Sequence, residues 1–234
     1  MKRFDGKTAL ISGASRGLGR ALAIALADEG AHVILIARSV GALEEVDDII
    51  QNNGGSATLV PMDLLETNNI DGLAAPLFER FKKLDILVGC AAMLGKLTPL
   101  PQYDPKLFED IFRLNVTANW RLLRALDPLL RASDAGRAVF MTSSAAQEHK
   151  HYWGGYAATK AALESLIQTY AAELERSNAK VNLVDPGPMA TKLRLSAYPG
   201  EDQSTLPTPE DKVADILALL LADSNQNGEI ITLS

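Results

Sequence analysis

Residues 7–19 read Lys-Thr-Ala-Leu-Ile-Ser-Gly-Ala-Ser-Arg-Gly-Leu-Gly, and this stretch is the strongest indication of the fold class. The apolar run at 7–12 ends in glycine, which predicts a short buried strand. Apolar residues recur at helical spacing over 13–30, and 32–37 is apolar almost throughout, as expected for a strand covered on both faces. A strand, a glycine turn, a helix and a second strand in this order predict the first unit of a parallel sheet.

The same alternation continues along the chain. Further strands are predicted at 58–62, 84–90, 137–143, 180–184 and 229–233. Further helices are predicted at 40–52, 70–82, 105–130, 153–175 and 208–222. Together they predict one α/β domain over 1–234, with a doubly wound, Rossmann-type sheet of about seven parallel strands and helices on both faces. The one long irregular stretch, 188–207, is predicted to be a substrate loop, because long loops in compact domains usually serve binding.

Composition argues against several classes of protein. The net charge of -6 is opposite to that of a nucleic-acid binder, which neutralises phosphates with lysine and arginine. Cys90 is the only cysteine, so no intrachain disulfide is possible and the cytoplasm is the expected compartment. Residues 1–11 are too charged for a signal peptide, and no run of about eighteen apolar residues predicts a membrane span. His149 and His151 lack a third ligand of suitable spacing, so no metal site is expected.

The turn after the first strand has the spacing Gly-x-x-x-Gly-x-Gly, at Gly13, Gly17 and Gly19. Glycines there let the backbone approach a pyrophosphate, and the following helix offers it unpaired N–H groups. The alternative interpretation is a tight turn that needs glycine for packing alone. Its place between the first strand and the first helix favours the nucleotide site.

Two arginines indicate which dinucleotide the site prefers. An acid at the end of the second strand binds the ribose hydroxyl of NAD, whereas arginine accommodates the phosphate of NADP. Here the second strand ends in Ala37-Arg38-Ser39, and Arg16 lies in the glycine turn. Either arginine alone could be a solvated surface charge, but both in these positions favour NADP(H) over NAD(H).

Tyr156 and Lys160 form a candidate acid–base pair. They are four residues apart, so on a helix they share one face. An ammonium beside a phenol is expected to lower the phenol pKa, and such a phenol can exchange a proton with a carbonyl or alcohol oxygen. Ser143 precedes Tyr156 by thirteen residues and could hold the same oxygen. The neighbouring Ser144 is a rival, which strand alternation would point to the opposite face.

In their order and spacing, these motifs resemble those of the short-chain dehydrogenases/reductases. The resemblance covers nearly the whole chain and is closest to bacterial oxoacyl-carrier-protein-reductase-like members of unassigned substrate. It is carried by the glycines of 13–19, Asp63-Leu64, Leu114-Asn115-Val116, Ser143, Tyr156-x-x-x-Lys160 and Pro186-Gly187-Pro188-Met189-Ala190-Thr191.

The resemblance implies an NADP(H)-dependent oxidoreductase that moves hydride between nicotinamide and a carbonyl or secondary alcohol. Tyr156 would be the general acid or base, Ser143 would bind the substrate oxygen, and Asn115 would support a water-linked proton relay. Lys160 would lower the tyrosine pKa and hold the nicotinamide ribose, with Asp63 at the adenine and Thr191 at the carboxamide. The residues expected to contact the cofactor are Gly13, Ser15, Arg16, Gly17, Leu18, Gly19, Arg38, Asp63, Leu64, Ala91, Tyr156, Lys160, Pro186, Gly187, Met189 and Thr191.

One departure supports a different class of function. After the fourth strand such proteins usually have Asn-Asn-Ala-Gly, but this chain has Gly89-Cys90-Ala91-Ala92. A catalytically inactive nucleotide-binding regulatory or scaffold protein of the same fold is therefore the alternative. Retention of Ser143, Tyr156, Lys160 and Asn115 favours the enzyme.

Other side chains have two possible roles. Met93, Leu94 and Trp153 either line an apolar substrate pocket or belong to the core. Helices 105–130 and 154–175 resemble those through which family members pair, so a homodimer or homotetramer is expected. Their apolar residues, which serve either that contact or the sheet, are Leu107, Ile111, Leu114, Leu122 and Leu126.

Overall fold

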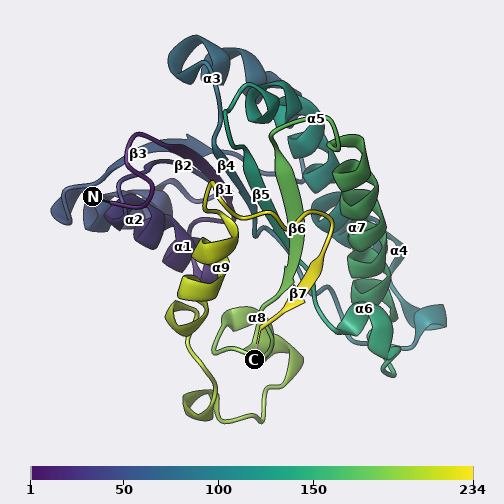
Figure 1. The fold of residues 1–234 in the computed structure, drawn as a ribbon. Coiled ribbons are helices and arrows are strands. Elements are labelled where there is room, and N and C mark those ends of the chain that lie inside the picture. The colour runs from purple at the N-terminus through teal and green to yellow at the C-terminus, as the bar shows by residue number, and fades with distance from the viewer. Residues whose placement is uncertain (1, 234) are drawn as a thin grey trace.

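The computed structural model describes residues 2–233 and contains one seven-stranded sheet in which every neighbouring pair is parallel (Figure 1). The strands are β1 (Thr8–Ser12), β2 (His32–Ala37), β3 (Ser56–Pro61), β4 (Ile86–Gly89), β5 (Arg137–Met141), β6 (Lys180–Asp185) and β7 (Ile230–Thr232). Their order in space is β3-β2-β1-β4-β5-β6-β7, so the winding reverses between β1 and β4. The predicted fold class is confirmed.

Helices cover both faces of this sheet. They are α1 (Gly17–Asp28), α2 (Val40–Asn52), α3 (Ala74–Phe81), α4 (Pro105–Phe112), α5 (Ala118–Arg131), α6 (Ala145–Glu148), α7 (Gly154–Glu173), α8 (Lys192–Ala197) and α9 (Val213–Leu219). One core layer joins α1, α2 and α9 to the sheet, and the other joins α5 and α7 to it (Figure 1). Side chains of β1 alternate between them: Ile11 packs in the first layer and Leu10 in the second. Among the described helices, none is both long and apolar enough to cross a membrane.

Several predicted boundaries were wrong. The helix expected at 105–130 is divided by a π-helical turn at Arg113–Thr117, and the one at 70–82 starts as a 3₁₀ turn at Thr67–Leu73. The third strand begins two residues earlier than expected, because this edge strand already pairs with β2 at Ser56, opposite His32. The stretch 188–207 is not irregular throughout, since it contains α8, which begins where the Thr191 hydroxyl accepts a hydrogen bond from the Arg194 N–H.

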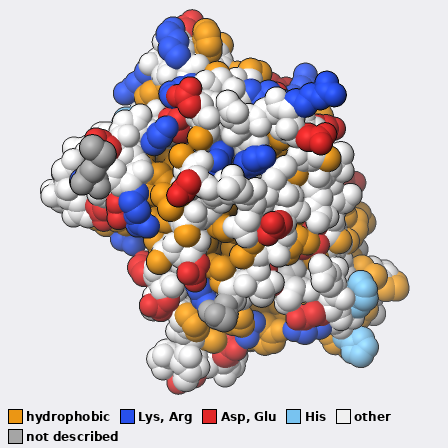
Figure 2. Space-filling model, in the orientation of Figure 1, with side chains coloured by type: hydrophobic (Ala, Val, Ile, Leu, Met, Phe, Trp, Pro, Cys, Tyr) orange, Lys and Arg blue, Asp and Glu red, His pale blue; other side chains and the backbone are white. Residues whose placement is uncertain are grey.

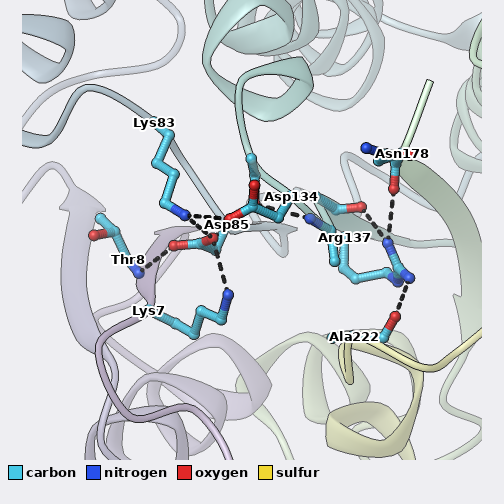
Figure 3. Close-up of polar contacts among 11 residues, drawn as sticks. Lys7, Thr8, Lys83, Asp85, Asp134, Arg137, Asn178 and Ala222 are labelled. Carbon is cyan, nitrogen blue, oxygen red and sulfur yellow. Dashed lines mark hydrogen bonds and ion pairs between the residues drawn. The ribbon is translucent and has the colours of Figure 1, made fainter.

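The amino ends of the central strands are joined by a buried carboxylate (Figure 3). Asp85 precedes β4 and accepts hydrogen bonds from the Ser133 hydroxyl (2.7 Å) and the Thr8 N–H (3.1 Å). The Lys7 ammonium lies 3.4 Å away, so the charge is paired. Arg137, at the start of β5, donates to the main-chain carbonyl groups of the preceding Gly136 and of two other segments, at Asn178 (3.0 Å) and at Leu221 and Ala222. Polar groups thus fix the edge of the sheet opposite the carboxyl ends of the strands.

Acidic and basic side chains are interspersed on the face of the molecule shown in Figure 2. Histidine side chains appear at its edge, near α6, where His149 and His151 follow the helix and are exposed. In residues 2–233, no group of three metal-ligating side chains comes together.

Candidate active site

A cleft of about 1230 Å³ opens at the carboxyl ends of the strands. It lies where the winding reverses, which is where open α/β sheets bind their ligands. It brings together every residue predicted to contact a cofactor, and also Ser143. Asn115 is the one predicted catalytic residue outside its lining.

The glycines of the first turn serve packing as well as access. A Cβ on Gly13 would lie 2.9 Å from the Ala91 main chain, so this glycine is required by the turn itself, as the alternative interpretation proposed. Gly17 is different: its φ of +53° favours glycine, and an added Cβ would meet only the Thr191 methyl group, at 3.6 Å. Gly17 also begins α1, whose N-cap residue Arg16 supplies no side-chain cap. The first N–H groups of α1 are therefore available to an anion in the cleft.

The unusual turn after β4 is held by Ser12. Its hydroxyl donates to the Val88 carbonyl (3.4 Å) and accepts from the Ala91 N–H (3.3 Å). This hydroxyl thereby connects β1 to the turn in which the usual asparagines are missing. Desolvation raises the pKa of the Cys90 thiol to about 12, so it is a packing group rather than a nucleophile.

The side chain of Arg38 is 70% exposed and borders the cleft at the end of β2. One of its nitrogens lies 3.9 Å from the Asp63 carboxylate, a loose pair that contributes little in water. The other oxygen of Asp63 accepts from the Leu65 N–H (2.9 Å), as a cap of the strand end would. Arg38 is thus free to reach a negatively charged group.

Tyr156 is buried on α7, close to Ser143. Burial raises the pKa of Tyr156 well above its usual value, and the charge of Asp185 acts in the same direction, whereas a hydrogen bond with Ser143 opposes it. The predicted lowering of this pKa by Lys160 was therefore wrong for this structure. The reason is positional, because the Lys160 ammonium donates to the Met141 carbonyl (2.7 Å) and lies 5.5 Å from the centre of the Tyr156 ring.

Lys160 is only 3% exposed. Burial lowers its pKa to about 8, although the nearby Cys90, Asp185 and Glu164 oppose that change. A lysine with such a pKa changes charge close to neutral pH, which is a property of functional sites.

Asn115 lies in the π-helical turn and is fully buried. Its amide accepts from the Met93 N–H (2.9 Å) and donates to the Met93 carbonyl (2.9 Å) and the Thr159 hydroxyl (3.0 Å). The side chain thus connects the segment after β4 to α7. Its part in a proton relay stays a prediction.

The two serines differ, but for another reason than the one predicted. β5 ends at Met141, so strand alternation does not apply to them. Ser144 is the N-cap residue of α6, and its hydroxyl bonds to the Glu148 carboxylate. Ser143 is the serine that hydrogen-bonds Tyr156.

Asp185 is a site residue that sequence reasoning missed. It is 7% exposed, and its two oxygens accept from the N–H groups of Ser144 (2.7 Å) and Gly187 (3.0 Å). One carboxylate therefore holds the loop of the predicted catalytic serine against the loop predicted to contact the nicotinamide. Its position directly before Pro186-Gly187 was the available signal.

The remaining candidates divide between the cleft and the core. Met93 and Trp153 line the cleft, whereas Leu94 packs in a small cluster with Tyr156. On the helices predicted to pair, three of the five named residues are buried within the chain and belong to its core: Ile111, Leu122 and Leu126. Leu107 and Leu114 are half-buried, and Trp120 and Leu166 are the exposed large apolar side chains.

Comparison with known proteins gives consistent results. The family model described as short chain dehydrogenase matches residues 7–202. The uncharacterised oxidoreductase YciK of Escherichia coli strain K12 is 36% identical over 220 residues, which are 93% of this chain and 87% of that protein. A short chain dehydrogenase from Pseudomonas syringae superposes with a TM-score of 0.96 at 35% identity, covering 99% of this chain and 96% of that one. Another, from Escherichia coli CFT073 in complex with NADPH, has a TM-score of 0.95 at 34% identity, covering 99% and 98%.

Proposed function

The chain belongs to the short-chain dehydrogenase family of oxidoreductases, as its motifs predicted, and we propose that it is an NADP(H)-dependent reductase or dehydrogenase acting on a carbonyl or secondary alcohol. The observation that carries this proposal is the convergence of Ser143, Tyr156 and Lys160 in one cleft with the glycine turn. Related proteins of known structure support the choice of cofactor, because one of them was crystallised with NADPH.

The residues present fit a dinucleotide. The uncapped start of α1 suits a pyrophosphate, and the positive φ of Gly17 keeps this first helical position without a side chain that would face the ligand. Arg16 and Arg38 both border the cleft and suit the additional phosphate of NADP(H). When bound, the nicotinamide supplies or accepts the hydride.

Side chains of the protein donate and return the proton in this reaction. With its pKa raised by burial, Tyr156 stays protonated and is suited to donate to the oxygen of a carbonyl undergoing reduction. Ser143 holds that oxygen beside the phenol. Lys160, whose pKa is about 8, can take part in returning a proton to Tyr156 near neutral pH.

Three further features belong to the proposal. The segment 188–207, with α8, would close over the substrate. A homodimer or homotetramer would form through α4, α5 and α7, where Trp120 and Leu166 are exposed, and light scattering at micromolar concentration tests this. A cytoplasmic location is inferred from the single cysteine.

The first test is a fluorescence titration with NADPH and, separately, with NADH. Tight binding of NADPH and much weaker binding of NADH are expected. Turnover should then be abolished in Tyr156→Phe while its affinity for NADPH is retained. Binding of neither nucleotide would contradict the proposal and the nucleotide-binding scaffold alike. Tight binding of NADPH without reduction of any carbonyl compound would favour the inactive scaffold.

A further inference from the structure

Three aromatic rings connect the catalytic helix to α8. The Trp153 ring centre lies 6.0 Å from that of Tyr156, edge to face at 71°, and 5.7 Å from that of Tyr198, tilted by 38°. All three residues line the cleft. An aromatic wall therefore begins at the phenol that would donate the proton.

Tyr198 is also in contact with Arg194. The Arg194 guanidinium lies 3.9 Å from the centre of the Tyr198 ring. Two nitrogens of Arg194 each lie 2.6 Å from a carboxylate oxygen of Glu201, which gives a bidentate pair. Because the ion pair with Glu201 restrains Arg194, and Arg194 contacts the Tyr198 ring, Tyr198 loses little conformational freedom when a ligand packs against it.

Two cations next to this wall, Arg194 and Lys150, are paired with carboxylates. Arg194 is occupied by Glu201, and the Lys150 ammonium lies 2.5 Å from the Glu148 carboxylate. A substrate carboxylate or phosphate would have to displace one of these partners. Lys192, which also borders the cleft, directly follows Thr191 in the segment expected to contact the cofactor.

Four further residues of the cleft lining have apolar side chains. They are Met93, Ala145, Leu193 and Ala197. The hydroxyls of Ser143 and Tyr156 suit one oxygen, that of the reacting carbonyl. A polyhydroxylated sugar would lose hydration against these apolar side chains without recovering hydrogen bonds there.

We propose that the substrate is a neutral, apolar ketone that carries an aromatic or fused ring, and that this ring packs against Trp153 and Tyr198. This inference rests on the proposed function and narrows it. In the reductive direction the carbonyl carbon accepts the hydride of NADPH and its oxygen accepts the proton of Tyr156. The products are a secondary alcohol and NADP⁺, and the phenol regains its proton from solvent.

The test compares four probes at saturating NADPH: acetonaphthone, an acetylnaphthoate that adds a carboxylate, an unbranched methyl ketone of equal carbon number, and a ketose. The kcat/KM for acetonaphthone should exceed each of the others by about tenfold or more. In Trp153→Leu and Tyr198→Leu, the ratio of kcat/KM for acetonaphthone to kcat/KM for the unbranched ketone should fall about tenfold. Phe78→Leu, which removes an exposed ring on α3 outside the cleft, should leave that ratio unchanged.

Binding is measured separately from turnover, by calorimetric titration of the Tyr156→Phe variant loaded with NADPH. The inference is overturned if kcat/KM for acetonaphthone is no higher than that for the unbranched ketone or the acetylnaphthoate. The proposed reductase activity is still supported in that case. An unchanged ratio in both wall variants would also overturn the inference. If no probe is reduced but acetonaphthone binds with the expected preference, the proposed function fails and the ligand class is supported.

Discussion

Replacing Lys160 with methionine should change how the free energy of unfolding depends on pH. Burial lowers the pKa of Lys160 from its ordinary 10.5 to about 8. Each pH unit of that difference corresponds to about 1.4 kcal/mol, so keeping the ammonium charged inside the fold costs about 3 kcal/mol below pH 8. The hydrogen bond to the Met141 carbonyl, lost in the variant, offsets part of this cost.

The sign follows from proton binding. Between about pH 8 and 10.5 the unfolded chain binds a proton at Lys160 that the folded chain does not, so stability rises with pH over this window. From pH 7 to pH 9.5 the wild type should gain about 2 kcal/mol relative to Lys160→Met. Other titrating groups, including Tyr156, are present in both proteins and largely cancel in this difference.

Urea unfolding followed by circular dichroism at the two pH values measures the difference, provided that the denaturant slopes agree. The matched control is Lys106→Met, which removes an exposed lysine of α4 and should follow the wild type at both pH values. Parallel stability curves for the wild type and Lys160→Met would refute the claim that this lysine is buried at a cost. The variant should also lose at least about a hundredfold in kcat/KM.

Other substitutions test the site more directly. Ser143→Ala should lower kcat/KM about a hundredfold and Ser144→Ala less than about tenfold, and steady-state kinetics giving the reverse order would assign the role to Ser144. Arg38→Asp should weaken NADPH binding about tenfold or more and NADH binding far less, so equal losses in fluorescence titrations would remove the argument for NADP(H). Asp185→Asn should cost about tenfold in kcat/KM by loosening the serine loop, yet little once Ser143 is already alanine. Additive losses in that double-mutant cycle would show that Asp185 does not act through Ser143.

Much of the architecture could be predicted because the signals are local. The apolar run, the glycine turn and the following amphipathic helix each occupy neighbouring residues, and their order implies a parallel sheet. Element boundaries were less predictable because they depend on partners elsewhere in the chain. The start of β3 is one case, because it follows the pairing of Ser56 with His32 of β2.

The candidate site also contains residues that the sequence predicted and contacts that only the structure shows. Tyr156, Lys160 and Ser143 are predicted site residues because of their spacing together with the glycine turn and the family resemblance. Spacing could not show that Asp185 lies against Ser144, forty-one positions away, or that Tyr198 packs against Trp153.

Local sequence patterns predict the order of strands and helices along the chain, the turn proposed for the dinucleotide and the candidate acid–base residues. The protonation behaviour of those residues follows from the folded structure, in which burial raises the pKa of Tyr156 instead of lowering it. The physical reason is that periodicity and turn chemistry depend on neighbouring residues. A pKa depends instead on burial and on charges that distant segments bring together.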